Sequence, residues 1–92
     1  MEIEFDPAKR ALTLERRGLD FARCVELFAA PHLTRADERV DYGEPRFIGV
    51  GILDEDVIVV VWTPRGTARR IISMRKANGR EKAFFRAYLA GS

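Results

Sequence analysis

Two apolar segments separated by a short acidic stretch constrain the fold of this chain more than any other feature. Residues 46–53 and 57–63 are mostly apolar, and the second range is rich in the β-branched side chains that favour strands. Asp54-Glu55-Asp56 between them is short enough for a tight hairpin loop. A second turn at Pro64-Arg65-Gly66 leads into a third strand over residues 68–75. The sequence therefore predicts an antiparallel meander at the centre of the fold.

The third strand of this meander carries several basic side chains, and strand alternation predicts where each one points. Successive side chains of a strand face opposite sides of the sheet. One predicted set is Arg70, Ile72 and Met74. The other predicted set is Arg69, Ile71, Ser73 and Arg75.

The N-terminal segment predicts a short strand followed by a helix. Residues 2–5 alternate polar and apolar side chains, as a strand does. Asp6 followed by Pro7 is a helix start, because Asp caps the free N–H groups and Pro lacks the N–H that would be unpaired there. Gly18 is expected to end the helix in a left-handed conformation.

A second helix is predicted between Asp20, as its cap, and Pro31, which stops it. Its apolar residues recur at helical spacing and predict one buried stripe. These residues are Phe21, Cys24, Val25 and Phe28. Residues 31–45 are polar and irregular, with at most a short strand over 32–35.

The chain closes with a helix that begins near Asn78. Asn78 and Glu81 have the spacing of a capping box, in which each side chain bonds the other residue's backbone N–H. The order β-α-α-β-β-β-α predicts a single α+β domain over residues 1–92. Its expected form is a small antiparallel sheet of three or four strands, with two N-terminal helices and one C-terminal helix.

The charges are unevenly distributed along the chain. Residues 65–92 contain eight basic residues and one acidic residue, so their net charge is +7. The remaining residues carry −5, because the whole chain has a formal charge of +2. A basic block on a small domain is typical of a protein that binds a polyanion, although a solvated charged face would give the same composition.

Several kinds of site are not expected. The sequence contains one histidine and one cysteine, so no cofactor is predicted and no metal site, which would need clustered ligands. Cys24 lies on the predicted apolar stripe and is expected to be core. No glycine-rich phosphate loop is present. The acidic N-terminus and the short apolar runs predict neither a signal peptide nor a membrane span, so a cytoplasmic location is expected.

The abundant arginines are compatible with RNA cleavage without a metal. The 2′-hydroxyl of RNA can attack the neighbouring phosphorus, provided that protons are transferred and the phosphorane charge is stabilised. Arginine suits the second task, since its planar guanidinium binds two phosphate oxygens and stays charged.

The sequence also resembles a known family. Phe5-Asp6-Pro7-Ala8-Lys9 resembles the opening motif of the BrnT toxins, and Tyr42-Gly43-Glu44, with Arg46-Phe47, resembles their central motif. Two further stretches, over residues 59–66 and 70–77, resemble their C-terminal signature, which continues at Arg80-Glu81.

The resemblance implies a RelE-like ribonuclease toxin of a type II toxin–antitoxin pair. Such a toxin cuts cellular RNA, inhibits growth, and is neutralised by a BrnA-type antitoxin that alone contacts operator DNA. The chain departs from the family pattern at Thr13, Arg17 and Pro64. Arg17 stands where the family has histidine, so it would contact phosphate rather than transfer a proton.

These arguments predict two groups of site residues. The predicted catalytic residues are Arg75, Lys9, Arg70, Glu81 and Arg46. The predicted RNA-binding residues are Arg17, Arg65, Arg69, Lys76 and Arg80. Arg75 is the first candidate for the reacting phosphate, and its plain alternative is an edge arginine paired with an acid. Glu81, the only acid of the basic block, has a capping role as its plain alternative. For Arg46, the plain alternative to a catalytic role is a salt bridge with Glu44.

Two other functions remain open at this point. One is a noncatalytic nucleic-acid-binding module, which would bind RNA without cutting it. The other is a protein-interaction domain whose basic face meets an acidic partner, which would show no RNA affinity at moderate salt.

Overall fold

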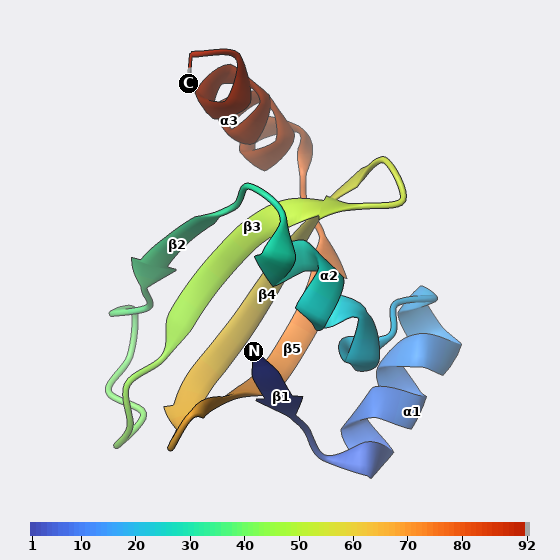
Figure 1. The fold of residues 1–92 in the computed structure, drawn as a ribbon, viewed down its shortest axis with the longest axis vertical. Coiled ribbons are helices and arrows are strands. Elements are labelled where there is room, and N and C mark those ends of the chain that lie inside the picture. Colours follow the sequence, from blue (N-terminus) through green and yellow to red (C-terminus); the bar gives the residue numbers. More distant parts are fainter. Residues whose placement is uncertain (92) are drawn as a thin grey trace.

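A five-stranded mixed sheet forms the centre of the molecule in the computed structural model, which describes residues 1–91 (Figure 1). The strands are β1 (Glu2–Glu4), β2 (Leu33–Ala36), β3 (Phe47–Leu53), β4 (Asp56–Arg65) and β5 (Ala68–Lys76). The helices are α1 (Pro7–Arg17), the 3₁₀ helix η1 (Phe21–Arg23), α2 (Cys24–Ala29) and α3 (Gly79–Ala90). The strand order across the sheet is β1-β5-β4-β3-β2.

The predicted meander of β3, β4 and β5 is confirmed, and all its pairings are antiparallel. Asp54 and Glu55 form the first turn, both with positive φ (50° and 71°), as a two-residue hairpin loop requires. The second turn lies one to two residues later than predicted, at Gly66 and Thr67, because β4 continues through Arg65. Gly66 supplies a φ of 60° there.

The α+β class is confirmed, whereas the prediction of a three- or four-stranded, wholly antiparallel sheet is wrong. Residues 33–36 form β2, an edge strand that pairs with β3. β1 pairs with β5 in parallel and closes the opposite edge of the sheet. A three-residue strand contains too little local pattern to show which distant strand it will pair with, so its parallel direction had no signal in the sequence.

The predicted helix boundaries rest on side-chain caps that the structure contains. The Asp6 carboxylate accepts from the Ala8 N–H at 2.9 Å, and Gly18 ends α1 with a φ of 68°. Asn78 and Glu81 form the complete capping box of α3, with both N–H···O distances at 2.9 Å.

The second helix is shorter and less regular than predicted. It begins as the 3₁₀ turn η1, capped by Asp20, and continues as α2 only to Ala29. The change of helix type rotates the apolar stripe, so Leu27 is buried while Val25 is 41% exposed. Val25 was therefore wrongly assigned to the core.

A bulge between β4 and β5 changes the predicted alternation of β5. Val61 opposes Ser73 and Trp62 opposes Ile71, which leaves Ile72 as the extra residue. Opposed residues share a face, so the register places Met74 with Ile71 and Arg69, and Arg75 with Arg70 and Ser73. The prediction that Arg69 and Arg75 share a face is therefore wrong.

The two faces of the sheet have separate apolar cores. Beneath η1 and α2 lies the larger cluster, which includes Phe21, Leu27, Ile58 and Trp62. The smaller cluster lies on the other face and receives Phe85 from α3. Figure 1 shows α2 in front of the sheet and α3 at the far end of it, so α3 covers only part of its face.

The close approach of α2 to β3 predicts a large effect of Gly51→Ala. A Cβ atom at Gly51 would lie 2.7 Å from Leu27 Cγ, whereas one at Gly79 meets nothing within 4 Å. Overpacking of this kind costs about 1–3 kcal/mol. We expect urea denaturation to show this loss for Gly51→Ala and little change for Gly79→Ala. Equal stability of the two variants would contradict the packing described here.

Candidate functional site

An arginine–carboxylate pair joins the end of β5 to the first turn of α3. Arg75 Nη1 and Nη2 donate to Glu81 Oε1 and Oε2, each at 2.8 Å. The same Glu81 Oε1 accepts from the Asn78 N–H at 2.9 Å. The pair is bidentate and therefore fixes the orientation of the guanidinium as well as its position.

Local structure explains why these two side chains meet. Arg75 opposes Val59 of β4, so it leaves the sheet on the face that carries α3. Buried Ala77 links β5 to the helix cap, and Glu81 occupies the third helical position, from which its side chain reaches back. The capping box that starts α3 thus also positions Arg75.

The pairing changes the ionisation of both groups. Hydrogen bonds from Arg75 are the largest cause that lowers the pKa of Glu81 to about 2, and the Asn78 N–H adds to the effect. The Glu81 carboxylate in turn raises the pKa of Arg75. Glu81 is consequently ionised at neutral pH and is a weak proton acceptor.

Two further arginines, which the sequence analysis did not single out, act electrostatically on this pair. Arg35 of β2 lowers the pKa of Glu81, and Arg39 lies close enough to Arg75 to oppose its positive charge. Both belong to the polar stretch 31–45, which had no periodic pattern to mark them. The only signal in the sequence was that these two positive charges lie in the part of the chain that is acidic overall.

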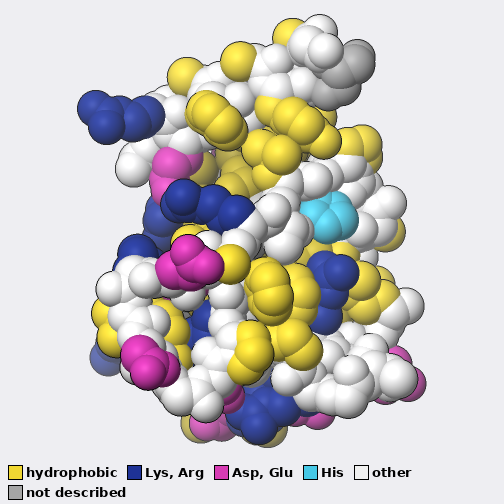
Figure 2. Space-filling model, turned by 90° about the vertical axis from the view of Figure 1, so that its left-hand side faces the viewer, with side chains coloured by type: hydrophobic (Ala, Val, Ile, Leu, Met, Phe, Trp, Pro, Cys, Tyr) yellow, Lys and Arg dark blue, Asp and Glu magenta, His cyan; other side chains and the backbone are white. Residues whose placement is uncertain are grey.

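A groove of about 440 Å³ lies beside the pair, between α3 and the edge formed by β2 and β3. Its lining consists of Leu33, Thr34, Arg35, Ile48, Val50, Arg80, Glu81, Phe84 and Phe85. Figure 2 shows hydrophobic side chains gathered where the helix meets the sheet edge, with Lys and Arg side chains next to them. The predicted residues Arg75, Glu81 and Arg80 are therefore brought together.

Other predicted residues lie elsewhere on the molecule. Lys9 is exposed on α1, which packs with η1 on the opposite face from α3. Arg46 precedes β3 at the end of the sheet far from α3 (Figure 1). There it forms the expected salt bridge with Glu44, at 3.3 Å. Its guanidinium carbon lies 4.0 Å from the centre of the Tyr42 ring. Arg65 pairs with the same Glu44 at 3.2 Å.

Arg70 and Arg17 each contact the protein itself. Arg70 shares the α3 face of the sheet but pairs with Glu4 of β1 at 3.3 Å. Arg17 donates to the Met74 carbonyl at 2.8 Å. It lines a second cavity, of about 460 Å³, together with Lys76, whose Nζ lies 3.6 Å from Asp56.

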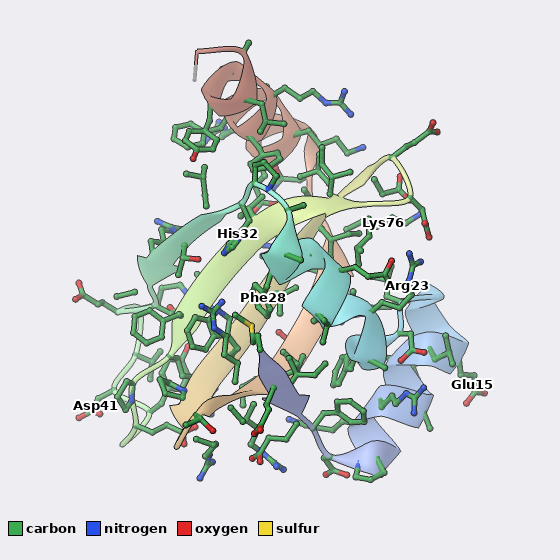
Figure 3. All side chains as sticks on the ribbon, viewed as in Figure 1. Glu15, Arg23, Phe28, His32, Asp41 and Lys76 are labelled. Carbon is green, nitrogen blue, oxygen red and sulfur yellow. The ribbon has the colours of Figure 1, made fainter. Side chains whose placement is uncertain are left out.

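Arg69 has a structural environment that differs from that of the other basic residues. Its guanidinium carbon lies 4.3 Å and 4.6 Å from the ring centres of Trp62 and Phe28. Its Nη1 and the Trp62 Nε1 are buried without a hydrogen-bond partner among residues 1–91. Burial lowers the pKa of Arg69. This arginine packs against the rings of Trp62 and Phe28, of which Phe28 is labelled in Figure 3, and is poorly placed for phosphate.

The described residues also contain few other reactive groups. Within 1–91, no three His, Cys, Asp or Glu side chains are grouped closely enough to hold a metal ion. Cys24 is buried, and desolvation raises the pKa of its thiol to about 12. In the same part of the chain, no helix has both the length and the apolar character needed to cross a membrane.

The lowered pKa of Glu81 predicts a specific effect of Glu81→Gln on acid stability. A carboxyl group whose pKa is lower in the folded state stabilises the fold above its unfolded pKa and loses that effect as the pH falls through the folded value. For Glu81 this interval runs from about pH 4.5 to about pH 2. Thermal unfolding should show a higher Tm for the parent than for the variant at pH 6, and this difference should shrink near pH 2. A difference independent of pH would contradict the assignment.

Comparison with known proteins gives one match to a family model. The model is described as the ribonuclease toxin BrnT of a type II toxin–antitoxin system, and it matches residues 5–81. The matched range contains every predicted site residue. No curated protein gives a significant match.

Proposed function

The chain belongs to the BrnT family of ribonuclease toxins, and from this premise we propose that it is a metal-independent endoribonuclease that cuts cellular RNA and inhibits growth. The observation that carries the proposal is the Arg75–Glu81 pair beside the groove under α3, with Arg35 and Arg80 next to it. We further propose a cytoplasmic location, where cellular RNA is accessible.

Arg75 keeps some of its N–H donors free for a phosphate even while its guanidinium is bound to Glu81. A guanidinium has five N–H groups. Glu81 takes one from Nη1 and one from Nη2, and the Lys76 carbonyl takes the second Nη1 hydrogen at 3.4 Å. The Nε–H and one Nη2–H remain, and the Arg75 side chain is 46% exposed. These two donors can bind two non-bridging oxygens of one phosphate.

The proposed reaction needs charge stabilisation above all. The 2′-oxygen attacks phosphorus and forms a bond to it, the bond to the 5′-oxygen breaks, and the 2′-proton leaves while the 5′-oxygen gains one. The phosphorane between these events carries added negative charge, which Arg75 is oriented to stabilise. A 2′,3′-cyclic phosphate and a 5′-hydroxyl are the products.

Glu81 is proposed to position Arg75 rather than to accept the 2′-proton. Its pKa of about 2 makes the carboxylate a weak base, and both its oxygens already accept hydrogen bonds. Arg70 shares the α3 face and remains a candidate for a second phosphate contact. Lys9 and Arg46 lie away from the Arg75–Glu81 pair and are proposed to contact RNA beyond the cut site.

An antitoxin partner completes the proposal. A type II system pairs its toxin with a protein antitoxin, and we propose a BrnA-type antitoxin through which alone the pair reaches operator DNA. The second candidate function is a noncatalytic RNA-binding module. The stretch of basic residues favours it equally, but a guanidinium held rigidly with free donors favours catalysis.

Removal of the Arg75 guanidinium should abolish RNA cleavage by a protein that still folds. Loss of one such donor group lowers kcat by about 10²–10³, and lysine restores little because it lacks the planar fork. We expect Arg75→Ala and Arg75→Lys to lose RNA cleavage and growth arrest in assays containing EDTA. Arg86→Ala, which removes an exposed arginine of α3 outside the groove, is the matched control. Full activity of Arg75→Ala would refute the site.

Salt dependence should separate surface arginines from the stacked one. Each phosphate contact with single-stranded RNA contributes about 0.7 to the slope of log K against log salt. We expect Arg80→Gln to lower this slope by about that amount and Arg69→Met to leave it unchanged. Binding of a 2′-O-methyl RNA, measured over a range of salt concentrations, gives both slopes. A drop for Arg69→Met alone would show that the stacked arginine contacts RNA.

A further inference from the structure

The groove under α3 has an apolar floor that the fold leaves uncovered. Leu33 and Val50 come from the sheet edge, and Phe84 and Phe85 come from the helix. Phe85 is fully buried, whereas Phe84, one position before it, is 71% exposed. A large aromatic side chain at the mouth of an apolar groove is characteristic of a surface that another molecule covers.

Positive charge borders this floor. Arg35 and Arg80 both line the groove and both are exposed. Neither forms a salt bridge with any residue in the range 1–91. Glu81, the one acid in the lining, already pairs with Arg75. The groove therefore combines an apolar surface with two available cations.

This combination fits a protein segment better than a nucleotide. A phosphate gains nothing from the apolar floor, because it needs polar partners. A segment with apolar side chains flanked by a carboxylate can cover the floor and pair with the arginines at once. Because the lining contains two arginines without a salt bridge within residues 1–91 and one glutamate that is already paired, the occupant is expected to carry negative charge.

We propose that the groove under α3 is the docking site of the antitoxin, through a segment that carries apolar side chains and at least one carboxylate. The inference deepens the proposed function and rests on it, because that function supplies the partner. A segment in the groove contacts Arg80 and Glu81 and covers the approach to Arg75. Antitoxin and RNA then exclude one another, which accounts for neutralisation without any change in the fold.

Affinity of the antitoxin for toxin variants tests this proposal. The probe is the purified BrnA-type antitoxin of the proposed pair, titrated against toxin prepared by cell-free synthesis. Phe84→Ala should weaken binding at least about tenfold, as loss of a central aromatic anchor does. Leu12→Ala is the matched control, since Leu12 is also an exposed apolar helix residue, 44% exposed, but lies on α1 (Figure 1). It should bind as the parent does.

A second variant and a second readout keep the outcomes distinct. Phe84→Gln keeps a long side chain at an exposed helix position and serves if the alanine variant does not fold. RNA cleavage by the free variants is measured in parallel and should equal that of the parent. Unchanged antitoxin affinity of a folded Phe84 variant overturns the proposal, as does weaker RNA binding with unchanged antitoxin binding. If the parent toxin does not cut RNA but its antitoxin binding still depends on Phe84, the proposed nuclease function is refuted. The proposed docking site is then supported.

Discussion

The backbone ladder between β4 and β5 determines how the rest of this molecule is arranged. β4 is the central strand, and its pairing with β5 contains the bulge that leaves Ile72 unmatched. Without that extra residue, Arg75 would lie on the same face as Arg69, beneath α2, and would be directed away from α3. The bulge therefore separates Arg69, which stacks on the aromatic core, from Arg75, which is partly exposed to solvent on the face that carries α3.

The Arg75–Glu81 pair joins two functions that are usually distinct. Glu81 completes the cap of α3, so the pair stabilises the helix start and also holds a guanidinium with two free donors. Exposed salt bridges contribute little to stability in general. Here the bidentate geometry and the added Asn78 N–H give the pair a defined orientation, and orientation is what a phosphate-binding arginine requires.

The sequence was sufficient for those parts of the fold that local chemistry determines, including the meander, both caps of α1 and the capping box of α3. It failed for β1, whose direction depends on a distant strand, and for the bulge, which no turn residue marks. Of the charged residues that the structure places at or beside the groove, the sequence singled out Arg75, Glu81 and Arg80, whereas Arg35 belongs to a stretch with no periodicity. Their roles in RNA cleavage stay a proposal. The RelE-like relationship implied by the family resemblance stays a prediction.

The most direct test is the chemistry of the RNA ends. The purified chain would be incubated in EDTA with an RNA that it cuts, and with the same RNA carrying one 2′-deoxynucleotide at the cut position. The account predicts a 2′,3′-cyclic phosphate on the upstream fragment and no cleavage of the deoxy-substituted RNA. Cleavage that persists at the deoxy position, or that leaves a 3′-hydroxyl, would contradict attack by the 2′-oxygen and the role assigned to Arg75.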